Sequence, residues 1–413
     1  MIKEKSPVEP IEMPTAENEN ASADLTELRC QISSTDDKLL KLFAERMRIA
    51  RSIARAKAGT DKPVYDPDRE DELLDRVSLK FSGEDSRRAQ NLMSTLMRMS
   101  RGAQYDLIRS TDESYDLGYV INHAADHLPA TASAVYQGPL SSYSSQACRM
   151  LYPDAQISSA RTFAEACRRV VDGIADVAVL PLENTTAGTV DDVYDLLIEY
   201  HLSIHQSISL PIRHCLLVAP GTKLEDVHEV VSHPQALAQC SEAILHYGWN
   251  VQESLNTAYA AALVRDNAGK GVAAIASAEA ASANNLRILL PDICNMPHNQ
   301  TRFIAVGRQL IITPDADRLS LVLRLPHRSG SLASTLDMFA DRGINLSKIQ
   351  SRPDPYQPWS YLFYLDADCP AADSQAMSAL YQLSKEMPYL KLLGWYHEIE
   401  GLSFEKQEVS END

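Results

Sequence analysis

The sequence predicts a multidomain protein with an all-helical N-terminal module, a larger α/β module and a small C-terminal module of mixed α and β structure. Three observations lead to this prediction. Apolar residues recur every three or four positions before residue 110, strand-like and helix-like segments alternate over residues 132–310, and a βαββαβ order follows from residue 318. We therefore expect domains at residues 24–112, 132–310 and 318–399, with a linker at 113–131.

Length and composition narrow the possible classes of protein. The chain has 413 residues, 45% of them hydrophobic and 23% charged, which is typical of a soluble globular protein of several domains. No apolar run approaches the roughly 18 residues of a membrane span. The N-terminus stays polar through Asp24, without the apolar core of a secretory signal, so we expect a cytoplasmic protein with no membrane partner. Residues 1–23 and 404–413 lack apolar periodicity and are expected to be disordered.

Net charge and cysteine content argue against nucleic-acid-binding and disulfide-bonded classes of protein. With 39 basic against 56 acidic residues, the formal net charge is -17, and this negative field disfavours binding to nucleic acid. A small anionic substrate must therefore meet a local cluster of Lys and Arg. The seven cysteines are scattered and contain no C-x-x-C pair, so we expect free thiols in a reducing compartment, no metal site and no disulfide framework.

The first module begins with one long helix. Apolar residues from Leu25 to Ile53 are spaced mostly by three, four and seven, without Gly or Pro before Gly59, which predicts a helix about 50 Å long. A second helix is predicted from about Asp66 and a third from about Asp85. The first helix is far too long to be covered by the other two, so we expect an intertwined helical dimer.

Charged residues on these helices are placed to hold a small anion. Arg46 and Lys57 are eleven residues apart and fall on one face of the first helix. Arg29 precedes Lys57 by 28 residues, about 42 Å along the axis, so it can reach the same ligand only from another subunit. The alternative to a ligand-binding role is that these residues are ordinary solvated charges on the protein surface.

A longer pattern in the same region resembles the all-helical chorismate mutase family. It runs from Leu28-Arg29 through Ala44-Glu45-Arg46, Ala56-Lys57 and Pro63-Val64 to Asp68-Arg69-Glu70. The resemblance implies that three arginines hold the two carboxylates of chorismate: Arg29, Arg46 and Arg69. It implies that Lys57 and Gln104 donate to the ether oxygen, and that Asp66, Glu70 and Ser100 hold the substrate hydroxyl or orient the others. A Claisen rearrangement suits such a pocket, because it needs positioning and charge stabilisation and no acid, base or nucleophile.

The second module alternates strand and helix patterns from Ala134 to Val306, which predicts parallel strands covered by helices. One helix is expected over residues 235–247. A change of pattern near residues 210–215 suggests two lobes with a ligand cleft between them. Four polar segments at strand ends can place hydroxyls and backbone N–H groups in that cleft, although ordinary turns and helix caps use the same residues. They are residues 138–144, 181–188, 232–235 and 299–303.

Taken in order, and with residues 190–197, these segments resemble prephenate dehydratase, a family with a two-lobed fold like that of periplasmic binding proteins. Thr301-Arg302-Phe303 is the most diagnostic feature. The resemblance implies that Thr301 is the catalytic threonine, that Arg302 meets a carboxylate, and that the other polar cleft residues are Asn184, Ser232 and Gln239. Because aromatisation drives the loss of carbon dioxide and hydroxide, the enzyme mainly helps hydroxide to leave, and we interpret Thr301 as a hydrogen-bond donor to it. His233 is a second candidate proton source. No cofactor is expected.

The third module has the βαββαβ order of the ferredoxin-like fold. Two of its stretches, residues 328–333 before a helix and 350–353 at a strand end, resemble the amino-acid-binding segments of the ACT domain, which hold phenylalanine in these enzymes. Gly330 permits backbone N–H groups to approach a carboxylate at the helix start. The family's acidic residue is replaced by Gln350. The implied regulatory residues are Gly330, Ser331, Leu332, Gln350, Ser351, Arg352 and Pro353.

Together the resemblances imply a bifunctional enzyme of phenylalanine biosynthesis that converts chorismate to prephenate and prephenate to phenylpyruvate. Feedback inhibition by phenylalanine and a homodimer or higher homo-oligomer are expected. One alternative is a monofunctional dehydratase whose helices serve only dimerisation, and the retained charged residues argue against it. The other is a non-catalytic amino-acid sensor, which has no reason to keep Thr301-Arg302 beside a complete charged pocket.

Overall fold

The computed structural model describes residues 24–399 apart from 59, 61, 268–269 and 355–356, so the expectations for residues 1–23 and 404–413 lie outside the described residues. The described chain divides into two compact units. One combines the residues up to Asn122 with Val322–Lys391, and the other combines His123–Leu321 with the residues from Leu392 on. The multidomain class that the sequence predicts is confirmed.

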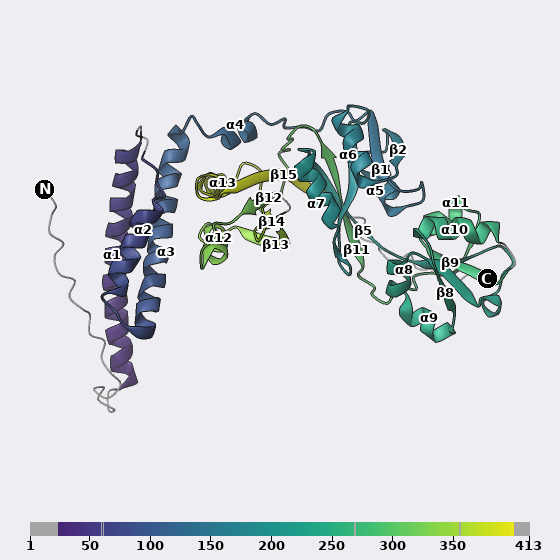
Figure 1. Ribbon diagram of the computed structural model, residues 1–413, viewed down its shortest axis with the longest axis horizontal. Coiled ribbons are helices and arrows are strands. Elements are labelled where there is room, and N and C mark those ends of the chain that lie inside the picture. The colour runs from purple at the N-terminus through teal and green to yellow at the C-terminus, as the bar shows by residue number, and fades with distance from the viewer. Residues whose placement is uncertain (1–23, 59, 61, 268–269, 355–356, 400–413) are drawn as a thin grey trace. The chain divides into compact units, whose positions relative to one another are not determined.

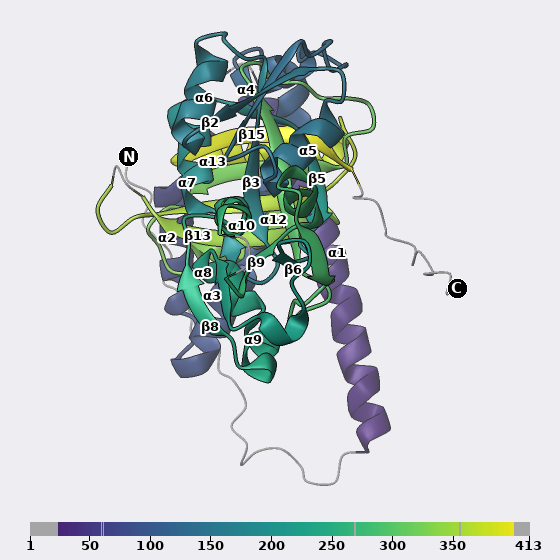
Figure 2. The ribbon, with the colours of Figure 1, turned by 90° about the vertical axis from the view of Figure 1, so that its right-hand side faces the viewer.

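The N-terminal module consists of α1 (Leu25–Lys57), α2 (Pro67–Ser78) and α3 (Gly83–Ile108), where the apolar spacing predicts them. Asp24 caps α1 by accepting a hydrogen bond from the Thr26 N–H. Asp66 caps α2 directly before Pro67, a residue that suits the first turn of a helix. α1 packs against α3, and its N-terminal end extends beyond α3 (Figures 1 and 2).

Much of the apolar surface of α1 is exposed in the single chain. Six of its side chains, 42% to 65% exposed, form what we call the α1 apolar stripe: Leu25, Leu28, Ile32, Leu39, Leu40 and Leu42. Most of them are three, four or seven residues apart, which places them on one side of the helix. Within its own chain, α1 therefore has an apolar face that α2 and α3 leave largely uncovered.

Part of the predicted linker is helical. After the 3₁₀ turn Arg109–Thr111, α4 (Asp116–Asn122) forms within residues 113–131. Its Ile121 is buried, and the ring of Tyr115 lies edge-on to that of Tyr381, with centroids 4.9 Å apart. Burial of these apolar groups stabilises a helix in a stretch whose polar composition suggests a loop.

The second unit contains two sheets. In the first the strand order is β15-β5-β11-β3-β1-β2, with β4 beside β3, and in the second it is β10-β6-β9-β7-β8. The strands of the first sheet are β1 (Ser133–Gln137), β2 (Gln156–Ala160), β3 (Val177–Asn184), β4 (Gly188–Thr189), β5 (Ser203–Pro211), β11 (Gln300–Gly307) and β15 (Tyr389–Ile399). Those of the second are β6 (Cys215–Val218), β7 (Glu229–Ser232), β8 (Asn250–Glu253), β9 (Val272–Ala276) and β10 (Arg287–Leu290).

Helices connect the strands of each sheet. Those of the first sheet are α5 (Tyr143–Leu151), α6 (Phe163–Val171) and α7 (Asp191–Glu199). Those of the second are α8 (Pro234–Gln239), α9 (Ser241–Tyr247), α10 (Thr257–Asp266) and α11 (Ala278–Ala283). The prediction of a single helix over residues 235–247 is wrong, because α8 ends at Gln239 and α9 begins at Ser241.

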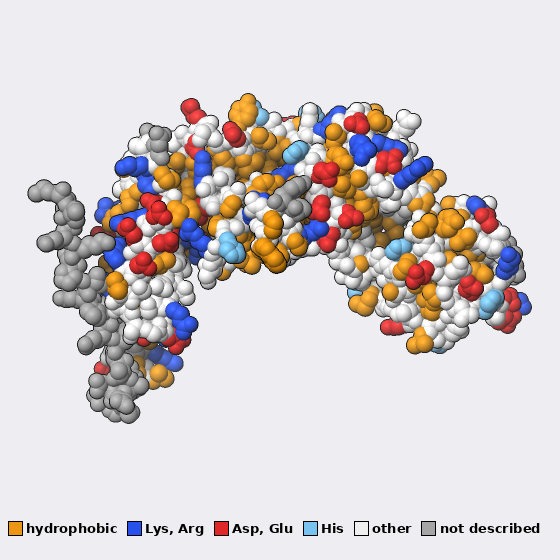
Figure 3. Space-filling model, in the orientation of Figure 1, with side chains coloured by type: hydrophobic (Ala, Val, Ile, Leu, Met, Phe, Trp, Pro, Cys, Tyr) orange, Lys and Arg blue, Asp and Glu red, His pale blue; other side chains and the backbone are white. Residues whose placement is uncertain are grey.

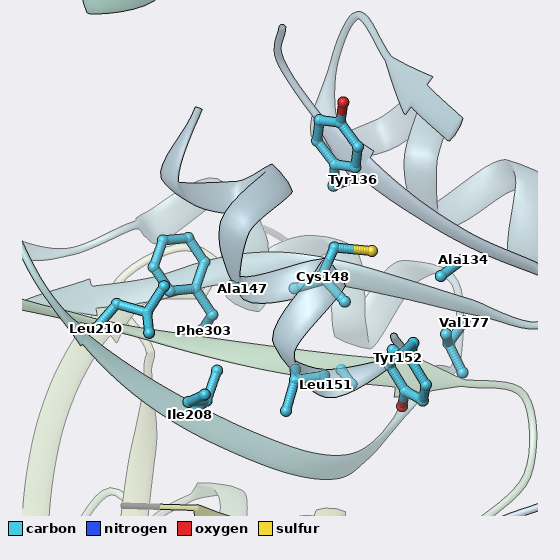
Figure 4. Packing of buried hydrophobic residues seen from close by; sticks show 12 residues of the cluster. Ala134, Tyr136, Ala147, Cys148, Leu151, Tyr152, Val177, Ile208, Leu210 and Phe303 are labelled. Carbon is cyan, nitrogen blue, oxygen red and sulfur yellow. The ribbon is translucent and has the colours of Figure 1, made fainter. Parts of the chain in front are cut away.

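The predicted parallel strands are present in both sheets, since β7 of the second sheet is parallel to β8 and β9, but the sheets also contain antiparallel pairs. β1 is parallel to β2 and β3, but β11 is antiparallel to both β3 and β5. β5 carries the chain toward the second sheet and β11 brings it back, so the two strands run side by side in opposite directions. The return strand is well anchored, since Phe303 of β11 packs in one buried cluster with Ile208 and Leu210 of β5 and with α5 (Figure 4).

The C-terminal module has the predicted βαββαβ order: β12 (Arg318–Arg324), α12 (Ser331–Ala340), β13 (Asn345–Pro353), β14 (Tyr361–Asp368), α13 (Ser374–Glu386) and β15. Within the first unit the strand order is β13-β14-β12, and β13 is an edge strand. α12 and α13 both contact α3 of the helical module.

The surface carries charges of both signs. On the face drawn in Figure 3, acidic and basic side chains are interspersed over both the helical and the α/β regions. Among the residues that the structure describes, no helix is both long enough and apolar enough to cross a membrane.

Candidate active sites

The helical module brings four of its eight predicted site residues together where α1, α2 and α3 meet. The guanidinium of Arg46 donates hydrogen bonds to the Ser100 hydroxyl and to the Leu96 carbonyl. The amide of Gln104, one turn along α3, donates to the Ser100 carbonyl at 3.2 Å. Burial lowers the pKa of Arg46, and the nearby Glu70 carboxylate opposes that shift, so cation and carboxylate share one environment.

Lys57 lies at the other end of this face, in the last turn of α1. Its ammonium donates to the carbonyls of Pro63 and Val64, at 2.6 Å and 3.4 Å. It lines a hollow of about 530 Å³ together with Tyr65 and Tyr105. The i,i+11 spacing thus places Lys57 and Arg46 on one face of α1. Each side chain is held by hydrogen bonds to another segment of the module.

The remaining predicted residues of this module lie apart from that cluster. The Asp66 carboxylate caps α2 by accepting the Arg69 N–H at 3.1 Å. The guanidinium of Arg69 is exposed and pairs with Glu72 at 3.2 Å. Arg29 is exposed near the start of α1, 17 residues before Arg46, or about 25 Å along the helix axis.

Arg101 is a buried residue of this region that sequence reasoning missed. Its guanidinium binds both carboxylate oxygens of Glu70, at 2.5 Å and 2.7 Å, and contacts the Glu386 carboxylate of α13 at 2.8 Å and 3.2 Å. Burial alone would lower the pKa of Arg101, but the two carboxylates outweigh it and raise the pKa. Burial also raises the pKa of Glu70, and Arg101 counters that shift. Since Glu386 lies 285 residues away, only the fold reveals this bridge.

The dehydratase residues predicted at residues 184 and 301 are opposite each other on neighbouring strands. Thr301 of β11 pairs in register with Asn184, the last residue of β3. The Asn184 amide nitrogen donates to the Thr301 hydroxyl at 2.9 Å and to the Asn299 side-chain oxygen at 2.8 Å. Both side chains are buried, so the network between them is rigid.

Gln239 reaches this network from the second lobe. Its amide nitrogen donates to the Thr186 hydroxyl at 2.9 Å, and Thr186 donates to the Asn184 side-chain oxygen at 2.7 Å. Thr186, Gln239 and Asn299 line a hollow of about 330 Å³. Asn184 is hydrogen-bonded to Thr186 and Asn299 of this lining, and Thr301 to Asn184. Sequence reasoning missed Thr186, although it lies in a polar segment that was singled out.

Two predicted dehydratase residues make other contacts. The Ser232 hydroxyl is fully buried at the end of β7 and donates to the Ile275 carbonyl at 2.6 Å. Arg302 is buried and pairs with the Glu183 carboxylate at 2.7 Å. His233, the alternative proton source, accepts the Gln235 N–H as the cap of α8. The structure therefore brings together Asn184, Thr301 and Gln239 and leaves these three residues outside the shared network.

The two stretches that the sequence predicts to be regulatory lie at the start of α12 and at the end of β13. Gly330 precedes α12 with a positive φ of 81°, a conformation that favours glycine. Arg328, two residues earlier, donates to the Tyr65 hydroxyl of the helical module at 3.2 Å. Gln350 to Pro353 end the edge strand β13 and pair with Tyr361 to Tyr364 of β14.

Comparison with known proteins decides the family. Three family models match: chorismate mutase type II at residues 28–105, prephenate dehydratase at 134–310 and the ACT domain at 319–385. A bifunctional chorismate mutase/prephenate dehydratase of Enterobacter agglomerans is 32% identical over 387 residues, covering 91% of this chain and 97% of that protein. The chain belongs to this bifunctional family. The enzyme of the same description from Escherichia coli K12 is 32% identical over 381 residues, covering 90% of this chain and 96% of its own.

Solved structures resemble about two thirds of the chain. The prephenate dehydratase of Arthrobacter aurescens, solved in complex with L-Phe, is 31% identical with a TM-score of 0.59, and the match covers 64% of this chain and 90% of that one. GqqA, described as a novel type of quorum quenching acylase, is 32% identical with the same TM-score and covers 64% and 96%.

The family membership establishes two activities for this chain. The helical module rearranges chorismate to prephenate, and the α/β module decarboxylates and dehydrates prephenate to phenylpyruvate. The substrates are therefore chorismate and prephenate, as the sequence predicts.

Proposed function

We propose that the mutase pocket is formed by Arg46, Lys57, Glu70, Ser100 and Gln104 of one chain. The observation that carries this proposal is the buried contact of Arg46 with Ser100, beside Gln104 and close to Glu70. Cations on one face of α1 would hold the carboxylates of chorismate in the reactive conformation, and Lys57 and Gln104 would stabilise charge at the ether oxygen. Asp66 and Arg69, which lie apart from this cluster in the structure, would contribute to the pocket from the start of α2.

We propose further that two chains pair through the α1 apolar stripe. Six exposed apolar side chains along one helix mark a surface that is buried by association. Arg29 lies among them, about 25 Å along the helix from Arg46. A functional Arg29 must therefore enter the pocket of the other subunit, which makes the active unit a homodimer or a larger homo-oligomer.

Complementation between two inactive variants tests this sharing. Arg29→Ala and Lys57→Ala proteins are each expected to be nearly inactive as mutases. When they are co-expressed, each heterodimer has one pocket with both residues intact and one with both lesions. A random mixture, half of it heterodimer, should recover about one quarter of the wild-type mutase activity.

A matched pair provides the control for this experiment. Arg46→Ala and Lys57→Ala lie in the same chain's pocket, so their heterodimer carries one lesion in each pocket and should recover nothing. If the Arg29 pair also recovers nothing, although mass spectrometry shows heterodimers, then Arg29 acts within its own chain. An Arg29→Ala protein that is itself active would show that Arg29 is only a surface charge.

For the dehydratase we propose that Thr301 donates a hydrogen bond to the departing hydroxide. Asn184 and Gln239 would hold the substrate and Thr301 in place. The observation that carries this proposal is the contact from the Asn184 amide to the Thr301 oxygen, because it makes Thr301 an acceptor there and leaves its proton for another partner. Ser232 would shape the second lobe through its backbone contact, and Arg302 would pair with a carboxylate.

We also propose that phenylalanine inhibits the enzyme through the ACT domain, by binding at Gly330, Ser331 and Leu332 and at Gln350 to Pro353. The Arthrobacter dehydratase, solved with L-Phe, and the positive φ of Gly330 at the start of α12 support this proposal.

We propose a reducing, cytoplasmic location for the protein, which the free thiols of all seven cysteines support.

Substitution of Gly330 tests the regulatory site. Gly330→Ala strains the backbone that positions the first N–H groups of α12, so the phenylalanine concentration for half inhibition should rise at least about tenfold. Gly343→Ala is the matched control, because Gly343 has a φ of 68° just beyond the other end of α12. Dehydratase rates with and without phenylalanine measure the effect. Equal sensitivity of the two variants would contradict this site.

A further inference from the structure

A run of side-chain hydrogen bonds crosses the dehydratase cleft and continues beyond the residues discussed so far. The ring Nε2 of His214 lies 3.1 Å from the side-chain oxygen of Gln239. From Gln239 the run passes through Thr186 and Asn184 to Thr301. His214 lies between β5 and β6, where the chain enters the second lobe, and it is 3% exposed.

Backbone N–H groups at Asn184 determine which groups donate and which accept along this series of hydrogen bonds. The side-chain oxygen of Asn184 accepts the N–H groups of Thr186 and Ala187, at 3.0 Å and 2.9 Å. Since backbone nitrogens can only donate, the amide of Asn184 has one possible orientation. Its nitrogen therefore faces Thr301, which must accept.

The same reasoning determines the donor and acceptor in the next two hydrogen bonds, from Gln239 to Thr186 and between Gln239 and His214. The Thr186 hydroxyl lies 2.7 Å from the Asn184 oxygen and 3.2 Å from the Asn299 oxygen, so its single proton is used on one of two acceptors. Toward Gln239 the Thr186 oxygen can then only accept, so the nitrogen of the Gln239 amide faces Thr186. The Gln239 oxygen consequently faces His214.

His214 must then carry its proton on Nε2. This tautomer leaves Nδ1 without a proton, and within the described part of the chain that buried atom has no hydrogen-bond partner. An unprotonated Nδ1 avoids the cost of a buried N–H with no acceptor. Burial lowers the pKa of His214, which keeps the ring neutral.

We propose that Thr186 and His214 are positioning residues of the dehydratase, which together hold the amide of Gln239 in one orientation across the cleft. Thr186 accepts one N–H of Gln239 and His214 donates to its oxygen. The second N–H of Gln239 is thereby left for a ligand of the hollow that Gln239 lines. This inference rests on the proposed role of Gln239 in binding the substrate.

Paired substitutions at Thr186 test the first half of the proposal. Thr186→Val keeps the shape but removes the hydroxyl, so kcat/KM for prephenate should fall about tenfold, the effect of one lost hydrogen bond in a buried site. Thr186→Ser restores the hydroxyl and should stay within about twofold of wild type. Thr185→Val is the control, because the hydrogen bonds of the neighbouring Thr185 hydroxyl go to backbone groups of His298 and Gln300 and not to Gln239.

Paired substitutions at His214 test the second half. His214→Phe preserves a planar ring but cannot donate to Gln239, so a loss of about tenfold in kcat/KM is again expected. His214→Gln places an N–H near the position of Nε2 and should recover most of the activity. Mutase activity of each protein, expected to be unchanged, shows that the chain has folded.

A double-mutant cycle separates this inference from the proposed function. If Thr186 and His214 act through Gln239, then Thr186→Val and His214→Phe should cause no further loss in a Gln239→Leu background. A Gln239→Leu protein with wild-type dehydratase activity would contradict the role of Gln239 itself. If Gln239→Leu is impaired but Thr186→Val and His214→Phe are active, or if their losses add fully to that of Gln239→Leu, the positioning role is wrong.

Discussion

Replacement of Thr301 by alanine is expected to lower the dehydratase rate by about a hundredfold, the usual effect of losing a donor aimed at developing charge. Thr301 is buried on β11, and its oxygen already accepts from Asn184, so the hydroxyl proton is available for the departing hydroxide. Without that proton, hydroxide leaves unaided and the barrier rises. The measurement is the appearance of phenylpyruvate from prephenate by ultraviolet absorbance.

Two comparisons make the Thr301 result interpretable. Mutase activity of the same protein should be unchanged, because Thr301 lies in the other unit of the chain. Thr301→Ser, which keeps the hydroxyl, should recover most of the dehydratase activity. If Thr301→Ala turns over prephenate within about threefold of wild type, far from the expected loss, Thr301 is not the donor.

Lys57→Ala is expected to produce the opposite pattern, with mutase activity lowered by at least about a hundredfold and dehydratase activity retained. Lys57 is the cation at the C-terminal end of the face that carries Arg46, and the rearrangement develops negative charge on the ether oxygen. The loss of chorismate absorbance measures the first activity, and phenylpyruvate formation from added prephenate measures the second.

Lys41→Ala is the matched control for Lys57→Ala. Lys41 is an exposed lysine of the same helix and is not among the proposed pocket residues, so its removal should leave both activities near wild type. Equal loss of both activities in Lys57→Ala, with the circular dichroism spectrum unchanged, would contradict separate sites for the two reactions.

Local pattern in the sequence predicted the elements that build the two sites. The helix α1 follows from apolar spacing alone, and its length puts Arg29 out of reach of Lys57 in the same chain. The βαββαβ order of the C-terminal module was equally readable, because each strand and helix there is a separate periodic segment. Strand β5 buries polar residues such as His205 and Ser207, so the usual alternation of polar and apolar residues is weak there.

Contacts between distant segments were decided only by the tertiary structure. The antiparallel course of β11 depends on where the chain returns from the second lobe, and no local pattern records that. Arg101 looks like a surface charge on a helix until α13 brings Glu386 against it. Thr186 and His214 become informative only when Gln239 lies between them. The physical reason is that a helix or strand is specified by the periodicity of neighbouring residues, whereas a buried ion pair or hydrogen bond is specified by which groups the packed core excludes from water.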